Sequence, residues 1–153
     1  MNEQRIESPA ALNALSERVI GAAIEVHREL GPGLLEGIYE EALTHEFGLR
    51  GLSFETQVEL PLTYKGVVLR GQRMDIVVEE VLVLELKAVE AIANVHLAQL
   101  LSYLRAAHLP LGLLINFHTD RLIDGVRRRI NSRAMEHPQS ISATSANAPR
   151  PLR

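Results

Sequence analysis

The stretch Val81-Leu82-Val83-Leu84-Glu85-Leu86-Lys87-Ala88 is apolar on both alternating faces until it reaches an acid and a base. This pattern predicts a strand that is covered on both sides. Because strand side chains alternate, Glu85 and Lys87 should point to the same face, about 7 Å apart along the strand. Burying these two charged side chains costs on the order of several kcal/mol per ion, unless they form an ion pair or bind a metal. The two residues therefore form either a salt bridge or part of a functional site.

The preceding segments predict two further strands joined by tight turns. A strand-like run covers Phe54–Tyr64, and Lys65-Gly66 suits a two-residue turn. Val67–Glu79 then runs back as a long strand, and Glu79-Glu80 turns the chain into Val81–Ala88. Because these connections are too short for crossovers, we expect an antiparallel meander of three strands.

Two helices are predicted before the meander. The first covers Pro9–Leu30 and ends at Gly31-Pro32-Gly33, since glycine can terminate a helix and proline cannot continue one. The second covers Leu34–Arg50 and stops at Gly51. We expect its buried stripe to consist of five apolar residues: Leu35, Ile38, Ala42, Leu43 and Phe47.

A helix, a strand and a short helix are predicted after the meander. Asn94 is a suitable N-cap for a helix over Val95–His108. Pro110 precedes the apolar strand Leu111–Phe117, which should lie parallel to Val81–Ala88 because a helix connects the two. A last helix is expected over Leu122–Asn131.

The predicted order is α-α-β-β-β-α-β-α, an α/β fold with a mixed sheet flanked by helices. With 153 residues, 46% of them hydrophobic, the chain suits one globular domain, which we place at residues 1–134. Residues 135–153 are rich in Ser, Ala and Pro and predict a disordered tail.

Composition excludes several classes of function. There is no cysteine, so disulfides, thiol catalysis and zinc–thiolate sites are absent. A net charge of −3 argues against a generally basic nucleic-acid binder, although local charge matters more than the total. No apolar run approaches the roughly 20 residues of a membrane span. We expect a cytoplasmic protein that does not interact with membranes.

Asp75 supplies a second acid beside Glu85. It lies in Arg73-Met74-Asp75-Ile76-Val77-Val78, and a tight turn at Glu79-Glu80 would place it opposite the region of Glu85 to Lys87. Acids from adjacent strands provide the oxygen ligands that Mg²⁺ prefers. A lysine beside such a metal can orient or deprotonate a bound water. The pattern therefore indicates metal-assisted hydrolysis of phosphodiesters.

Several segments, in the right order, resemble a known family. They are Ala23-Ile24-Glu25-Val26-His27-Arg28-Glu29-Leu30-Gly31-Pro32-Gly33, Gly33-Leu34-Leu35-Glu36-Gly37-Ile38-Tyr39, Glu85-Leu86-Lys87-Ala88-Val89-Glu90 and Leu111-Gly112-Leu113-Leu114-Ile115-Asn116-Phe117. Together they look like the GxxExxY protein family, a branch of the PD-(D/E)XK nuclease superfamily, over roughly residues 14–131. The resemblance implies a restriction-endonuclease-like αβββαβ core. Met74 stands where the superfamily name has proline.

The resemblance implies a role for each candidate residue. Asp75 and Glu85 would bind Mg²⁺ or Mn²⁺, joined by Glu36 and by the Leu86 backbone carbonyl. Lys87 would position the attacking water, and Gln99 matches a glutamine that related nucleases place near the site. Candidate substrate contacts are Tyr39, Arg73, His96 and Tyr103.

Each role has a structural alternative. Glu85 and Lys87 can form an ion pair, and Asp75 can pair with Arg73 or Arg70. Glu36 needs no further purpose, because an acid in the first turn of a helix is stabilised by about 0.3–1 kcal/mol. Tyr39 can simply cover the core, and Gln99 can be an ordinary polar helix position. The run Arg127-Arg128-Arg129 can contact phosphates or be a solvated helix end.

Together these features predict a small Mg²⁺-dependent nuclease, with DNA as the expected substrate and Glu36, Asp75, Glu85, Lys87 and Gln99 at its site. The alternative is a non-catalytic nucleic-acid-binding or protein-interaction module that keeps the nuclease fold. A third interpretation is hydrolysis of a smaller phosphate ester. A homodimer would be one way to complete a substrate groove.

Overall fold

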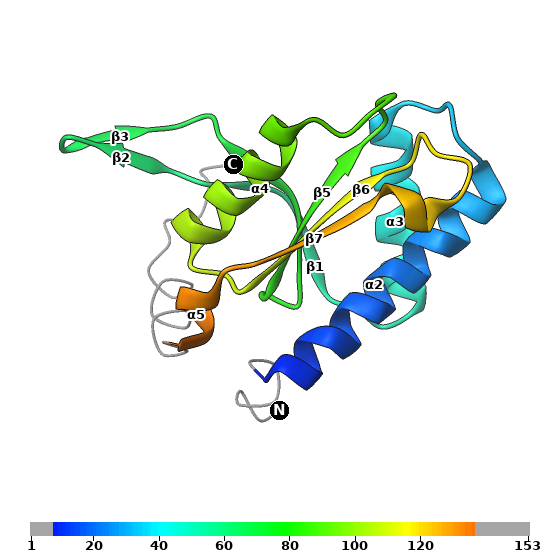
Figure 1. The fold of residues 1–153 in the computed structure, drawn as a ribbon, viewed down its shortest axis with the longest axis horizontal. Coiled ribbons are helices and arrows are strands. Elements are labelled where there is room, and N and C mark those ends of the chain that lie inside the picture. The colour runs from blue at the N-terminus through cyan, green and yellow to red at the C-terminus, as the bar shows by residue number, and fades with distance from the viewer. Residues whose placement is uncertain (1–7, 137–153) are drawn as a thin grey trace.

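A computed structural model describes residues 8–136 as a five-stranded mixed sheet with helices on both faces (Figure 1). The sheet order is β1-β4-β5-β6-β7. Its strands are β1 (Phe54–Glu59), β4 (Arg73–Val78), β5 (Leu82–Lys87), β6 (Leu111–Asn116) and β7 (Val126–Ile130). The strands β2 (Leu62–Tyr64) and β3 (Val67–Leu69) form a separate hairpin.

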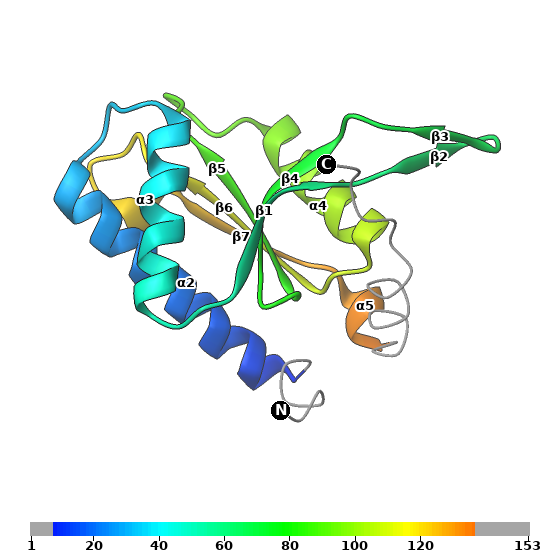
Figure 2. The same ribbon diagram turned by 180° about the vertical axis from the view of Figure 1, so that it is seen from behind.

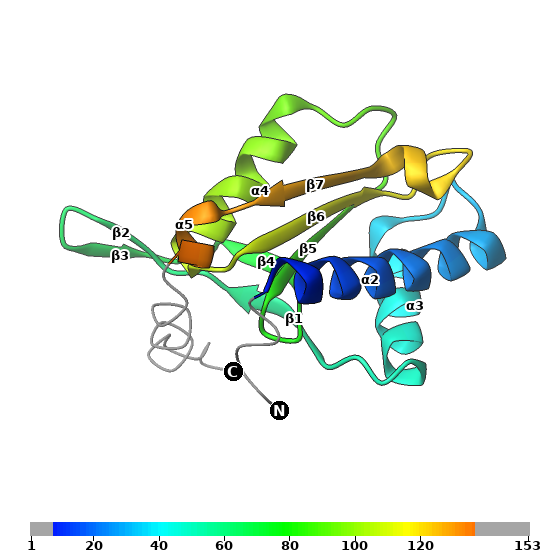
Figure 3. The same ribbon diagram turned by 60° about the horizontal axis from the view of Figure 1, so that its bottom comes forward.

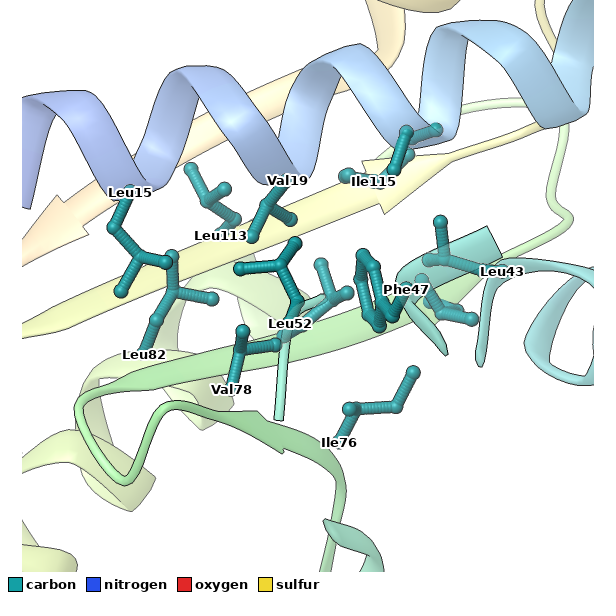
Figure 4. Close-up of a cluster of buried hydrophobic side chains, with 14 of the residues drawn as sticks. Leu15, Val19, Leu43, Phe47, Leu52, Ile76, Val78, Leu82, Leu113 and Ile115 are labelled. Carbon is teal, nitrogen blue, oxygen red and sulfur yellow. The ribbon is translucent and has the colours of Figure 1, made fainter. Parts of the chain in front are cut away.

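Helices cover the two faces of the sheet unequally. Helices α2 (Pro9–Leu30) and α3 (Glu36–Leu49) lie on one face and α4 (Asn94–Ala107) on the other, as Figures 2 and 3 show from two directions. The larger core lies under α2 and α3, where Val19, Phe47 and Leu82 are fully buried (Figure 4). A smaller core, including Val83, Leu100 and Leu114, lies under α4. No helix in this part of the chain is long and apolar enough to cross a membrane.

The central strand β5 is buried on both sides, as its sequence predicts. It pairs with β4 in antiparallel fashion and with β6 in parallel fashion. The tight turn at Glu79-Glu80 is confirmed, since both residues have positive φ (53° and 58°). The predicted mixed α/β fold is therefore confirmed.

The two long strands predicted around Lys65-Gly66 are wrong, because each is interrupted. Pro61, which has no N–H to donate, separates β1 from β2. Gly71, with φ of 112°, lies between β3 and β4. The β2–β3 hairpin consequently leaves the sheet and projects from the body (Figures 1 and 2), closed by the predicted turn at Lys65-Gly66.

The predicted buried stripe of the second helix is also partly wrong. Leu35 precedes α3 and is 78% exposed, and Ile38 is 45% exposed. The helix instead buries Tyr39, Leu43 and Phe47, which follow one another at intervals of four residues. A narrow stripe suffices because α3 covers only the end of the sheet.

The helix predicted over Leu122–Asn131 is wrong. A short 3₁₀ helix, η1 (Leu122–Gly125), is followed by the edge strand β7, which pairs with β6 in antiparallel fashion. Pairing supplies partners for the free edge of β6, and this outweighs the helix propensity of three arginines.

The other helix boundaries follow the prediction closely. The N-cap of α4 is Ala93 rather than Asn94, and α4 ends before His108, which has φ of 54°. A short helix, α5, covers Ser132–Glu136, where the predicted tail begins. The remainder of that tail, residues 137–153, lies outside the described residues.

Candidate functional site

Asp75 and Glu85 lie opposite each other where the ladder between β4 and β5 ends. The last paired residues are Ile76 and Leu84. Beyond them, the Asp75 N–H donates to Glu85 Oε1 (3.0 Å), and the Leu86 N–H donates to Asp75 Oδ2 (2.9 Å). Each carboxylate thus accepts a backbone N–H from the opposite strand, in place of a carbonyl. The two strands open around a pair of acids.

Both acids face α4. Leu84 and Leu86 of β5 belong to the core under α2 and α3, so Glu85 and Lys87, which alternate with them, point to the opposite face. Asp75 alternates with Ile76 of the same core and points the same way. The predicted convergence of Asp75, Glu85 and Lys87 on one face is what this register produces.

Glu85 is only 4% exposed. The pKa of its carboxyl is raised to about 8, first by burial and then by the Asp75 charge, although the Asp75 N–H and the Lys87 charge lower it. A buried carboxyl with a second acid beside it is difficult to ionise. A cation beside it would favour the ionised carboxylate.

Glu36 and Lys87 reach the same region from two elements. Glu36 is the first residue of α3, whose start lies beside the end of β5 (Figure 2). Desolvation raises the pKa of Glu36, Asp75 raises it further, and Lys87 lowers it. The carboxyls of Glu36, Asp75 and Glu85 and the Lys87 ammonium therefore share one electrostatic environment.

Helix α4 contributes Tyr103 and Gln99 from above this face. Tyr103 is 6% exposed, and its hydroxyl donates to Gln72 Oε1 (2.7 Å). Burial and then the charges of Glu85 and Asp75 raise the pKa of Tyr103, while Gln99 lowers it. Tyr103 thus lies near both acids, with Gln99 next to it.

Tyr39 shapes the site without entering it. Its side chain is fully buried and stacks on Phe117 with ring centroids 4.4 Å apart. Its hydroxyl donates to the Gly31 carbonyl and accepts from the Leu34 N–H (3.1 Å). This burial argues against the predicted substrate contact. Tyr39 instead fixes the loop that leads to Glu36.

Arg73 and His96 lie at the margin. Arg73 is exposed and donates to the Gln57 carbonyl of β1 (3.4 Å), so its side chain turns toward the neighbouring strand. The His96 Nδ1 accepts from the Ala93 N–H (3.0 Å) at the start of α4. Arg73 thus contacts the neighbouring strand and His96 the start of its own helix.

Asn116 is a positioning residue that the sequence reasoning missed. It is 2% exposed, lies beside Lys87 in the parallel ladder, and bonds both the N–H (3.0 Å) and the carbonyl (2.8 Å) of Val89. It thereby fixes the chain directly after Lys87. An asparagine at the end of the apolar run Leu111–Phe117 was the available signal.

Alternative ion pairs for the two acids are not found in the described chain. Arg70 pairs with Glu59 (3.1 Å) rather than with Asp75. No ion pair among residues 8–136 includes Asp75, Glu85 or Lys87. The same residues contain no set of three acidic or histidine side chains already gathered around one point as a metal site. The side chains of Asp75 and Glu85 instead accept hydrogen bonds from backbone N–H groups.

Comparison with known proteins assigns the family. The family model described as PD-(D/E)XK nuclease superfamily matches residues 13–129, which include α3 and every strand up to β7. No curated protein and no solved structure matches the chain. The observed αβββαβ order, with an acid on β4 and Glu85-Leu86-Lys87 on β5, agrees with that match. The chain belongs to the PD-(D/E)XK nuclease superfamily.

Proposed function

We propose that this protein is a divalent-metal-dependent nuclease that hydrolyses DNA phosphodiester bonds. Membership of the superfamily suggests nuclease-like activity and implies interaction with nucleic acid. The observation that carries the proposal is the opened end of the β4–β5 ladder. There two acids and Lys87 share a face, and no ion pair in the described chain neutralises the acids.

Asp75, Glu85 and Glu36 would hold Mg²⁺ or Mn²⁺, which prefer oxygen ligands. The Leu86 carbonyl suits the same role, because the Leu86 N–H points to β4 and the carbonyl of an extended residue points the same way. A bound metal would supply positive charge to the phosphate and lower the pKa of a water. Small side-chain rotations would bring the carboxylates from the N–H groups to the ion.

Lys87 would orient the attacking water and stabilise negative charge on the phosphate. It is partly exposed at the end of β5, whose following residues Asn116 fixes. Gln99 and Tyr103 would support the arrangement from α4, with the Gln72 bond holding the Tyr103 ring. These roles use a mixed set of charges in one partly buried region, where electrostatic effects are strong.

We propose that the chain belongs to the GxxExxY branch, and the positions of Gly33, Glu36 and Tyr39 support this proposal. Gly33 has φ of 99°, Glu36 begins α3, and Tyr39 lies one turn later in the core. The three positions are the parts of one loop-to-helix junction that brings an acid near Asp75. A homodimer and a cytoplasmic location remain predictions from the sequence.

The test is a cleavage assay on single-stranded, duplex and branched DNA and on RNA, with Mg²⁺, Mn²⁺ or EDTA. Lys87→Ala should lower cleavage by at least about 10²-fold, in the range of lost acid–base catalysis, while the melting temperature changes little. The matched control is Lys65→Ala, which removes an exposed lysine at the tip of the hairpin.

Cleavage that survives Lys87→Ala would refute this site assignment. Nucleic-acid binding without cleavage under any metal would favour the non-catalytic module. Turnover of small phosphate esters without loss of polymer would favour the third interpretation.

A further inference from the structure

The charge of this chain is divided between its two parts. The first 90 residues carry 16 Asp or Glu against eight Lys or Arg, whereas the remaining 63 carry three against eight. No acidic residue occurs between Ala91 and Thr119, which includes all of α4 and β6. The net charge of −3 therefore hides a basic region built from α4, β6, β7 and α5.

The strand β7 divides the run Arg127-Arg128-Arg129 between two faces. Arg128 pairs with Leu113 of the larger core, and its Nη2 donates to Asn13 Oδ1 of α2 (2.7 Å). Arg127 and Arg129 alternate with it and face α4. Their partners are Leu114 of the smaller core and Gly112, at which a Cβ would meet Leu100 and Leu104 of α4.

Two more arginines join this face from the helices. Arg105 of α4 and Arg133 of α5 line a hollow of about 360 Å³, together with Leu101, Ile130, Asn131 and Ser132. Figure 3 shows β7 running beside α4 toward α5. Arg105, Arg127, Arg129 and Arg133, which we call the arginine face, thus lie along one side of the molecule.

These cations are not used by the fold as ion pairs. No ion pair found in the described chain includes a member of the arginine face. Arg127 donates to the carbonyls of Asp124 and Val126, and Arg129 to that of Arg128, all main-chain groups. The acids nearest in sequence are Asp124, three residues before Arg127, and Glu136, three residues after Arg133, and neither is in an ion pair found among the described residues. The arginine face therefore keeps most of its charge for a partner.

The arginine face and the candidate site lie on the same face of the sheet, with α4 packed between them. Glu85 pairs with Leu114, and Leu114 pairs with Arg127, so Arg127 lies level with Glu85 two strands away, at about 10 Å. Helix α4, about 21 Å long for its 14 residues, spans the distance from the site to Arg105. Leu114, which lies between Glu85 and Arg127, is fully buried under α4, so a polyanion that reaches both the acids and the arginines would cross the outer surface of that helix.

We propose that the arginine face binds the phosphate backbone of the nucleic acid that enters the candidate site. This inference rests on the proposed nuclease function and assigns residues that contact its substrate outside the cleavage point. A nucleic acid fits better than an anionic membrane, because the arginines lie on the same sheet face as the acids and Arg127 is level with Glu85. Phosphate contacts of this kind are sequence-independent and sensitive to salt.

The test measures binding, apart from cleavage, in EDTA. Fluorescence anisotropy measures the affinity of the protein for a labelled duplex and for a labelled single strand, at KCl concentrations from about 50 to 200 mM. Arg127→Gln with Arg129→Gln, and separately Arg105→Gln with Arg133→Gln, should each lower affinity about tenfold. Each pair should also reduce the slope of log K against log salt by about 2, one for each lost phosphate contact.

The matched control removes two arginines from the opposite face. Arg18→Gln with Arg28→Gln on α2 should change the affinity less than about twofold, since both side chains are exposed among acids. Arg127→Lys with Arg129→Lys should retain most of the affinity, because the charge stays. Melting temperatures show whether either double variant is unfolded. If one is, the affinity of the other double variant tests the inference.

An equal loss in the control pair, unchanged affinity in both test pairs, or binding to anionic phospholipid vesicles but not to nucleic acid would overturn the inference. Binding through these arginines without cleavage under any metal would refute the nuclease activity and support the arginine face. If the wild-type protein cleaves nucleic acid and both double variants cleave it equally well, the nuclease activity is supported and the arginine face is refuted.

Discussion

At the scale of the residue, Glu85 makes stability depend on pH. Its pKa is about 8 in the folded protein against 4.5 for an ordinary glutamate. Between these values the folded state binds more protons than the unfolded state, so the free energy of unfolding falls as pH rises. In EDTA, wild-type protein should lose on the order of a few kcal/mol from this group between pH 4.5 and pH 8.

Glu85→Gln should remove this loss, because the amide keeps an oxygen for the Asp75 N–H and cannot ionise. The variant should melt above wild type at pH 8.5 and near it at pH 5. Thermal melts in EDTA across this range check the expectation, with the exposed Glu90→Gln as control. Parallel curves for wild type and Glu85→Gln would contradict it.

Tyr39→Phe should destabilise the loop before Glu36. The change removes the acceptor for the Leu34 N–H and the donor to the Gly31 carbonyl, at a cost of about 1–3 kcal/mol. Urea unfolding measures this cost, and cleavage should fall with it because Glu36 follows the loop. Tyr64→Phe, at a tyrosine 59% exposed, is the matched control and should change neither. A neutral Tyr39→Phe would show that the hydroxyl does not hold the loop.

The candidate site could be predicted only where local pattern fixed geometry. Asp75, Glu85 and Lys87 followed from two strands and a two-residue turn, whose register leaves little freedom. Tyr39 did not, because whether a tyrosine faces solvent or core depends on the rotation of α3. The Asn116 clamp was missed because its partner, Val89, is 27 residues away in sequence.

At the scale of the element, β7 shows why the last segment was mispredicted. Arg127-Arg128-Arg129 has helix propensity, and its apolar neighbours Val126 and Ile130 suit either structure. The decision comes from β6, whose edge takes β7 as partner along five residue pairs. Nothing local to the run contains that information. The β2–β3 hairpin was predicted in part: the turn at Lys65-Gly66 was expected, but the predicted strands continued through Pro61 and Gly71.

Gly125, the last residue of η1 and directly before β7, should not accept a side chain without strain. A Cβ there would lie 2.2 Å from the Asn116 carbonyl oxygen, so the β6–β7 connection would have to move. Gly125→Ala should cost at least about 2 kcal/mol, comparable to other steric changes in packed regions. Gly48→Ala in α3, with nothing within 4 Å of its Cβ, should instead be neutral or stabilise by up to about 1 kcal/mol. Denaturant midpoints of Gly125→Ala and Gly48→Ala show whether the first variant is destabilised and the second is not. Equal changes in the two midpoints would contradict the expectation.

At the scale of the whole molecule, the fold was predictable because its core is simple. One doubly covered strand, β5, separates a larger core under α2 and α3 from a smaller one under α4. The periodicities of the helices and of the central strands report this division directly. The placement of the acidic and basic parts on the folded surface is not in those periodicities, because it depends on which edge β7 joins.

The final prediction concerns the coupling of metal binding to global stability. Folding places two acids together and leaves Glu85 protonated near neutral pH, so a cation that binds only the folded site should stabilise the protein. At 100 times its dissociation constant, Mg²⁺ or Mn²⁺ should contribute about 2.7 kcal/mol and raise the melting temperature by roughly 5–15 °C. The rise should be larger at pH 8 than at pH 6, because the metal must displace a proton from Glu85.

Thermal melts without metal and over a series of metal concentrations up to about 100 dissociation constants measure this coupling, and the shift should grow with the logarithm of the concentration. Asp75→Asn and Glu85→Gln should each abolish the rise, whereas Asp124→Asn, at an exposed acid of η1, should retain it. A rise that persists in Glu85→Gln would place the metal elsewhere. A rise that ignores pH would mean that Glu85 gives up no proton to the ion, and the opened ladder end would then need another explanation.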